Sequence, residues 1–321
     1  MLEDRLGRLS GHLSPPPACR RRQALRSHVA GGHADARPSK DDDPIVALGN
    51  STRTVAPGEI SEELMPTVEA LGLVENCRQL GQQGWTIVRD AASPEFVARL
   101  RETTLRLAGQ DPYSGGNVFA ALAKDDAYAE AALNPKAATM AEFSVGRGNL
   151  IGNLIGTTKT SAIPKLGLHA DQAMVPAPFP AHNMMLTCCW TLDDFTKDNG
   201  CTFVLPGSMA EMRHPTAAES AEQEEGVVAI ECPAGSLVLW DGRVWHGSFP
   251  RQAEGKRVAL HVTYNRLLMR PIEAYSDEQA DALCAKWGKA MSTLLGREDY
   301  LQKPSLPSLE TFSQTMLNVR S

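Results

Sequence analysis

From about residue 150 to about residue 265, the chain alternates between short runs rich in β-forming residues and short segments that favour turns. Asn199-Gly200 and Asp241-Gly242 are hairpin signals, and Pro206-Gly207-Ser208 interrupts a run between them. The strands expected around these turns are Met184–Leu192, Cys201–Leu205, Val227–Ile230, Leu237–Trp240 and Arg257–Tyr264. Many short strands separated by regular turns predict an all-β core of the sandwich or jelly-roll type.

The segments on either side of this region favour helices that would flank the β core. Ser93-Pro94 predicts a helix start, with serine as the N-cap and proline at the first helical position, and Gly109 closes that helix. A last helix is expected from about Ser276 to Leu295, where an apolar stripe recurs at helical spacing. Just before the first of these helices, Trp85–Val88 is expected to form a strand.

These elements predict a single domain over residues 60–310, with N-terminal helices, a jelly-roll core at about 150–265 and a C-terminal helix at about 276–295. Residues 1–45 have no sustained apolar periodicity, and eight Lys or Arg face three acids through Lys40. We predict a disordered tail there. A transit peptide or a nucleic-acid-binding arm would have a similar composition.

The composition narrows the class of protein. The 321 residues are 42% hydrophobic and 22% charged, as in ordinary globular proteins, and the net charge of −6 argues against a nucleic-acid surface. No run approaches the 18 apolar residues of a membrane span. The seven cysteines form no CxxC pair, and no apolar signal segment precedes them, so we expect reduced thiols in a cytoplasmic protein.

His169-Ala170-Asp171 places an imidazole and a carboxylate two residues apart. On a strand, that spacing directs both side chains to the same face. His246, 75 residues after Asp171, is the candidate third ligand of a metal site with two histidines and one carboxylate. Each histidine alone is more simply a structural residue, and the same triplet occurs as His33-Ala34-Asp35 in the tail, so the context decides.

Arg257 is the neighbouring residue that favours the metal-site interpretation of these histidines. It lies eleven residues after His246, where Arg257, Ala259 and His261 would share one face of the last strand. A guanidinium that points into a β core needs a planar anion, and a carboxylate is its natural bidentate partner. Ser248, on the same face as His246, adds a hydroxyl donor. The alternative for Arg257 is a surface ion pair on an edge strand.

Several motifs follow one another in a fixed order: His169-x-Asp171, Trp190, Asn199-Gly200, Pro206-Gly207-Ser208, Asp241-Gly242, Trp245-His246-Gly247-Ser248 and Arg257. As a set they resemble the phytanoyl-CoA dioxygenase family over about residues 70–310. The resemblance implies a double-stranded β-helix fold, related to the cupins. It also implies Fe(II), 2-oxoglutarate and O2 as cofactor and cosubstrates. One departure is Met209, where the family usually has a histidine after the Pro-Gly-Ser triplet.

By this resemblance, His169, Asp171 and His246 are the iron ligands and the catalytic residues. Arg257 and Ser248 would hold the distal carboxylate of 2-oxoglutarate, and Trp190 would lie beside the cosubstrate. Oxidative decarboxylation of the keto acid would yield succinate and CO2 while a substrate is oxidised. Because Asp171 is retained, hydroxylation or desaturation is expected rather than halogenation.

The substrate is expected to be a small or medium organic molecule. The apolar, proline-rich segment 174–180 follows the ligands closely and is expected to form a stiff loop near the mouth of the site. Two other functions remain open: a non-catalytic protein on the same barrel, and a cupin-type metal protein that needs no keto acid. No nucleic-acid or membrane partner is expected, and the sequence does not indicate the oligomeric state.

Overall fold

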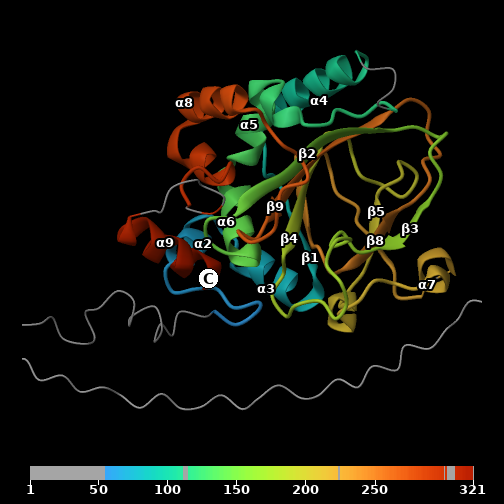
Figure 1. Cartoon of the computed structure of the whole chain (residues 1–321). Coiled ribbons are helices and arrows are strands. Elements are labelled where there is room, and N and C mark those ends of the chain that lie inside the picture. Colours follow the sequence, from blue (N-terminus) through green and yellow to red (C-terminus); the bar gives the residue numbers. More distant parts are fainter. Residues whose placement is uncertain (1–54, 111–114, 223–224, 300, 302–307, 321) are drawn as a thin grey trace, which may run out of the picture.

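The protein is described as a computed structural model, which covers residues 55–110, 115–222, 225–299, 301 and 308–320. Its centre is two antiparallel sheets that face each other (Figure 1). The five-stranded sheet has the order β1-β7-β4-β9-β2, and the four-stranded sheet has the order β3-β8-β5-β6. This is the expected jelly-roll core. The predicted tail, residues 1–45, lies outside the described residues.

The described residues contain nine strands, and the six whose bounds were predicted from the sequence agree with the prediction to within a residue or two. Their bounds are β1 Trp85–Val88, β2 Leu150–Lys159, β3 Leu166–His169, β4 Met185–Thr191, β5 Thr202–Leu205, β6 Val228–Ala229, β7 Leu237–Asp241, β8 Trp245–Ser248 and β9 Arg257–Asn265. Along β9, Val258, Leu260, Val262 and Tyr264 join the large core, as the alternation predicts. Arg257 and His261 instead line a cavity on the other face.

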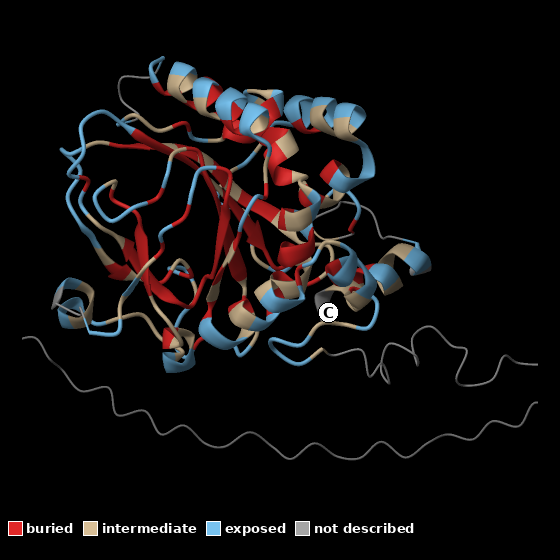
Figure 2. Cartoon of the chain, turned by 180° about the vertical axis from the view of Figure 1, so that it is seen from behind, coloured by how far each residue is buried: buried red, intermediate tan, exposed pale blue. Residues whose placement is uncertain are grey.

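Helices cover the outer face of the five-stranded sheet (Figures 1 and 2). Those that pack against its strands are α3 Val74–Gln83, α4 Pro94–Ala108, α6 Pro135–Val145 and α8 Asp277–Leu294. On the same side lie α2 Met65–Ala70, α5 Asp126–Ala132 and α9 Leu309–Arg320, whereas α7 Ala217–Glu222 lies beside β3. Ser93 caps α4 by accepting a hydrogen bond from the Phe96 amide at 3.2 Å. Helix α8 is broken at Gly288, whose φ of 70° is not helical.

The largest core lies between these helices and the five-stranded sheet. A second cluster, which includes Phe195, Val238 and Ala259, packs between the two sheets at one end. A cavity of about 510 Å³ that is lined by residues of both sheets lies between them. No helix among the described residues is long and apolar enough to cross a membrane.

Asp241-Gly242 does not form the hairpin that the sequence suggested. Strand β7 pairs with β1 and β4 in one sheet, whereas β8 pairs with β3 and β5 in the other. The dipeptide therefore turns the chain from one sheet into the other. Glycine is required there because a Cβ atom on Gly242 would lie 2.7 Å from the Met185 carbonyl oxygen.

Candidate metal centre

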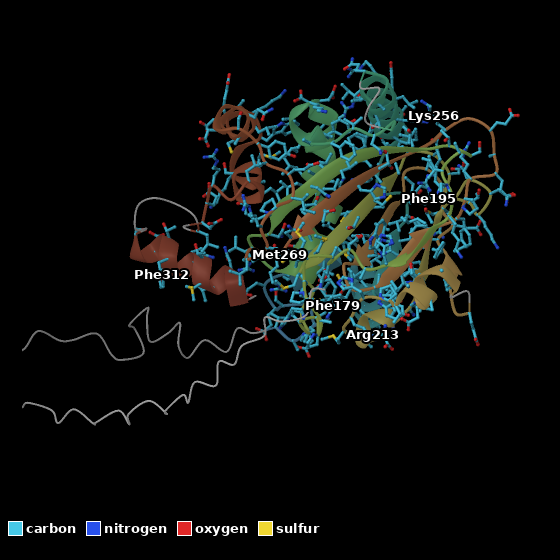
Figure 3. The ribbon with its side chains drawn as sticks, turned by 45° about the vertical axis from the view of Figure 1, so that its right-hand side comes forward. Phe179, Phe195, Arg213, Lys256, Met269 and Phe312 are labelled. Carbon is cyan, nitrogen blue, oxygen red and sulfur yellow. The ribbon has the colours of Figure 1, made fainter. Side chains whose placement is uncertain are left out.

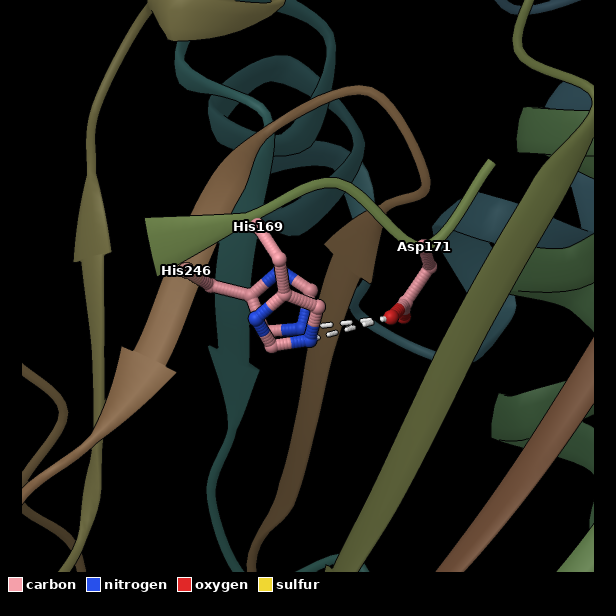
Figure 4. Close-up of side chains that lie close together, drawn as sticks. All are labelled: His169, Asp171 and His246. Atoms are coloured by element: carbon pink, nitrogen blue, oxygen red, sulfur yellow. Dashed lines mark ion pairs between the residues drawn. The ribbon is translucent and has the colours of Figure 1, made fainter. Parts of the chain in front are cut away.

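Three side chains converge in the cavity between the sheets. His169 is the last residue of β3, Asp171 follows it, and His246 lies in β8; their ligand atoms are all within 4.8 Å of one another (Figure 4). His169 Nε2 and His246 Nε2 lie 3.6 Å and 3.4 Å from Asp171 Oδ1. The structure therefore brings together the three residues that the sequence nominated as ligands.

The convergence depends on the end of β3. The β3–β8 register pairs His169 with His246 after an irregularity between Leu166 and His169. Asp171 lies beyond the strand, where the Gln172 amide donates to the Gly242 carbonyl at 3.0 Å. The expectation that both residues of the His-x-Asp motif lie on one strand face is therefore wrong. A bend after the strand directs the carboxylate toward the imidazoles.

The hydrogen bonds of the two imidazoles fix their tautomers. His169 Nδ1 lies 3.1 Å from the Gly167 carbonyl oxygen, and His246 Nδ1 lies 3.1 Å from the Val244 carbonyl oxygen. Because a carbonyl oxygen can only accept, each Nδ1 donates and each Nε2 of a neutral ring presents a lone pair to Asp171 Oδ1. Three electron-rich atoms that face one another in this way fit a bound cation, and two nitrogens with one carboxylate oxygen suit iron(II).

The second oxygen of Asp171 is held by the five-stranded sheet. Oδ2 accepts hydrogen bonds from Thr187 Oγ1 and Trp240 Nε1, both at 2.8 Å. Burial alone would raise the pKa of this carboxyl group, but when His246 and His169 carry protons on Nε2, where a metal ion would otherwise bind, they hold the pKa well below its usual range. The carboxylate is therefore ionised, and Oδ1 is the oxygen that faces the imidazoles.

The same cavity ends at two buried cations. Lys159 on β2 is paired in register with Arg257 on β9, and each residue is 5% exposed. Lys159 Nζ donates to Ser248 Oγ at 2.6 Å, so the predicted cosubstrate residues Ser248 and Arg257 do lie together. Burial, and then the charge of Arg257, lower the pKa of Lys159 to about 8. Sequence reasoning missed Lys159, although it continues the inward alternation of Asn153, Ile155 and Thr157.

Arg257 is fixed without an acidic partner. Its guanidinium donates to the Gly200 carbonyl and lies 4.4 Å above the ring of Phe195, which is labelled in Figure 3. Its Nε atom is buried with no hydrogen-bond partner. Among the described residues, no carboxylate forms an ion pair with Arg257 or Lys159. Since a buried unpaired cation is unfavourable, this end of the cavity fits an anionic ligand.

Trp190 lies on the wrong face of β4 for the role that the resemblance implied. Thr187 lines the cavity, whereas Trp190 points into the large core, where its ring meets Phe96 edge to face at 6.0 Å. The expectation that Trp190 lies beside the cosubstrate is therefore wrong. His261, which was assigned no role, lines the cavity, and burial followed by Arg257 lowers its pKa to about 4, so the ring is neutral.

The expected mouth loop is also elsewhere. None of residues 174–180, all of which are described, lines the cavity, and Phe179 packs in a separate cluster with Leu168 and Trp245. The apolar edge of the cavity comes instead from Ile163, Leu166 and Ile272. The β2–β3 connection supplies Ile163, the start of β3 supplies Leu166, and the segment before α8 supplies Ile272, so none of them belongs to the proline-rich segment 174–180.

Comparison with curated proteins gives partial relatives. The chain is 31% identical over 146 residues to "Dioxygenase af480" of Aspergillus fumigatus, a match that covers 45% of this chain and 46% of that protein. It is 31% identical over 108 residues to "Uncharacterized protein Rv1501" of Mycobacterium tuberculosis, covering 33% of this chain and 38% of that protein. The chain thus spans less than half the length of these curated relatives.

Solved structures share the fold at low sequence identity. EctD from S. alaskensis with 2-oxoglutarate and 5-hydroxyectoine is 21% identical, with a TM-score of 0.53, over 70% of this chain and 85% of that chain. The epimerase SnoN in complex with Fe3+, alpha ketoglutarate and nogalamycin RO is 19% identical, with a TM-score of 0.52, over 74% and 93%. At these identities the likeness concerns the architecture, a jelly roll with flanking helices.

Residues 80–259 match the phytanoyl-CoA dioxygenase (PhyH) family. These residues contain all three converging ligand candidates, both buried cations and Ser248. Because the match covers more than half of the chain, the protein belongs to the phytanoyl-CoA dioxygenase family.

Proposed function

We propose that the protein is an Fe(II)- and 2-oxoglutarate-dependent dioxygenase that oxidises a small or medium organic substrate and releases succinate and CO2. One observation carries the proposal. The same cavity is lined by the three converging ligand candidates, His169, Asp171 and His246, and at one end by two buried cations, Lys159 and Arg257, which have no acidic partner among the described residues. A keto acid with a second, distal carboxylate satisfies both features.

His169 Nε2, His246 Nε2 and Asp171 Oδ1 would hold the iron. Three protein ligands leave other coordination positions open, as a cosubstrate and O2 require. Bound iron would supply the activation of O2 that is coupled to oxidative decarboxylation of the keto acid. The chain's own contribution is to fix both imidazole tautomers and to hold Asp171 Oδ2 through Thr187 and Trp240.

Arg257, Lys159 and Ser248 would bind the distal carboxylate of 2-oxoglutarate. The guanidinium fork is already oriented by Gly200 and Phe195, so little side-chain freedom is lost on binding. Lys159 and Ser248 are hydrogen bonded to each other and present a second positive charge. A metal protein that uses no keto acid, or a non-catalytic barrel, would leave both cations uncompensated, which disfavours these alternatives.

Anaerobic titration tests the proposal. Fe(II) and 2-oxoglutarate together should produce a weak visible charge-transfer band in the native protein and none in His246→Ala. Succinate should appear only when O2 is then admitted. The absence of both the band and 2-oxoglutarate binding at saturating cosubstrate would refute the assignment.

A further inference from the structure

Asn153 lies in the same row of side chains across the five-stranded sheet as Thr187, which donates a hydrogen bond to Asp171. In the five-stranded sheet, Thr187 of β4 is opposite Thr263 of β9, and Thr263 is opposite Asn153 of β2. Two strand spacings of about 4.8 Å place Asn153 roughly 10 Å from Thr187. Thr187 donates to Asp171, so Asn153 faces the metal-binding part of the cavity and is six residues along β2 from Lys159.

A β-bulge directs Asn153 into the cavity. The β2–β9 register shifts between Ile151 and Asn153, with Gly152 as the extra residue. The shift lets Ile151 pack in the large core while Asn153 lines the cavity. Bulges of this kind re-aim side chains next to active sites. A Cβ atom on Gly152 would lie 2.4 Å from Asn265 Oδ1, so any other residue there would displace the buried Asn265 side chain.

The amide of Asn153 is unused within the described part of the chain. Its Oδ1 atom is buried and has no hydrogen-bond partner, and its side chain makes no hydrogen bond to any described residue. Buried polar atoms are nearly always paired. An unpaired amide that lines a cavity therefore points to a ligand group that completes it.

The side chains that line the cavity beside Asn153 are uncharged, and several of them are apolar. Ile155, Met185 and Ile272 line the cavity near it. Ile272 is 55% exposed, and its segment is anchored because its amide donates to the Gly152 carbonyl at 2.9 Å. The charged residues of the cavity wall are Asp171 and three cations. Lys159 and Arg257 lie at the end away from Asn153. Lys165 is next to Leu166, which pairs with Ser248, so it belongs to the same end.

We propose that the substrate is an uncharged molecule with a largely apolar skeleton, oriented by a hydrogen bond between a hydroxyl, carbonyl or amide group and Asn153. This inference rests on the proposed function, because 2-oxoglutarate must occupy the cationic end. At the metal end the charge of iron would be offset by Asp171 and one carboxylate of the cosubstrate, and the excess positive charge would stay at the Lys159 and Arg257 end. A charged substrate would find no counter-ion among the residues that line the cavity at the Asn153 end, and it would lose its hydration. Asn153 is thus a specificity-determining residue.

Matched probes on one decalin skeleton test the inference: the alcohol and methyl ketone as neutral members, and the carboxylate and ammonium as charged members. Binding is measured anaerobically by calorimetry, with the full chain loaded with Fe(II) and 2-oxoglutarate. The neutral members should bind at least about tenfold more tightly than the charged ones. Asn153→Leu should weaken binding of the alcohol on the order of tenfold and leave 2-oxoglutarate affinity unchanged. Asn153→Asp should shift the preference toward the ammonium probe.

Thermal unfolding of the unliganded protein separates this role from a structural one. Asn153→Leu removes an unpaired buried acceptor, so it should not lower the unfolding temperature. Asn76→Leu is the matched control and should lower it, because the Asn76 amide donates to Thr86 Oγ1 at 3.0 Å and to the Ile87 carbonyl at 2.9 Å.

Three results would overturn the inference. They are tighter binding of a charged probe to the native protein, no binding of either neutral probe at millimolar concentration, and loss of 2-oxoglutarate affinity in Asn153→Leu with unchanged probe affinity. The last result would place Asn153 on the keto acid. These results differ from failure of the proposed function, because in that case the native protein would not bind 2-oxoglutarate.

Discussion

Lys159 of β2 and Arg257 of β9 are direct partners in the sheet register, so two buried positive charges lie side by side. Their hydrogen-bond partners are the Ser248 hydroxyl and the Gly200 carbonyl, which are neutral, and the ring below Arg257 is that of Phe195. Like charges that are held together in a desolvated site repel each other. The unliganded protein therefore holds this end of the cavity in an unfavourable state that a carboxylate relieves.

Arg257→Met should weaken 2-oxoglutarate binding by about tenfold to hundredfold, because a charge-assisted, bidentate contact is lost. Metal affinity should not change. Calorimetry with a redox-inert metal in place of iron measures both constants. Arg251→Met is a suitable control, since Arg251 is also buried but does not line the cavity. Equal effects of the two substitutions would remove Arg257 from the cosubstrate site.

Binding of 2-oxoglutarate should weaken as the pH rises through about 8. Burial and Arg257 lower the pKa of Lys159 to about 8, so its ammonium form predominates below that pH and attracts the carboxylate. Above that pH the neutral amine attracts it less, and the dissociation constant should rise by up to about tenfold per pH unit. Lys159→Arg should flatten the profile because arginine stays charged. A flat profile in the native protein would exclude Lys159 from the site.

Trp240→Phe should weaken metal binding by about tenfold to hundredfold, because it removes one of the two donors that orient Asp171. A chelator competition titration measures the change. Trp85→Phe is the matched control: Trp85 pairs with Trp240 on the neighbouring strand, but its Nε1 atom has no partner. If both variants bound metal like the native protein, the hydrogen bond to Asp171 Oδ2 would have no role in the site.

Trp190→Leu should lower the free energy of unfolding by about 2–4 kcal/mol, because a fully buried indole leaves a gap beside Phe96. Urea unfolding measures this loss. The 2-oxoglutarate dissociation constant of the folded variant should equal that of the native protein, since Trp190 faces away from the cavity. A selective loss of cosubstrate affinity would restore the role that the family resemblance implied.

The sequence predicted the side-chain faces correctly where a strand has one polar and one apolar face. In β9, Arg257 and His261 alternate with Val258, Leu260 and Val262, and the structure follows that alternation. Strand β4 gives no such signal because all seven of its residues are buried. When both faces of a strand are buried, hydrophobicity does not identify the inward face, and Trp190 was therefore misplaced.

Pairings between distant segments were equally hard to foresee. An Asp-Gly pair is compatible with a hairpin and with a crossing between sheets, and only the strand pairing distinguishes them. Lys159 was overlooked because its role depends on its register with Arg257, a relationship between residues 98 positions apart. The motif spacing did predict which three residues converge, namely His169, Asp171 and His246. They converge because the chain bends at Asp171, beyond the end of β3, and not because of strand periodicity.

The hydrogen bonds of Asp171 bear on which ions the protein would accept. Thr187 and Trp240 both donate hydrogen bonds to Asp171 Oδ2, so bidentate coordination of a metal ion by this carboxylate would require both hydrogen bonds to break. Calcium favours oxygen-rich shells, often with bidentate carboxylates, whereas the triangle offers two nitrogens and one oxygen. If the three candidate residues bind a metal, discrimination against large, hard cations would be set by Thr187 and Trp240 of the sheet wall as much as by those residues.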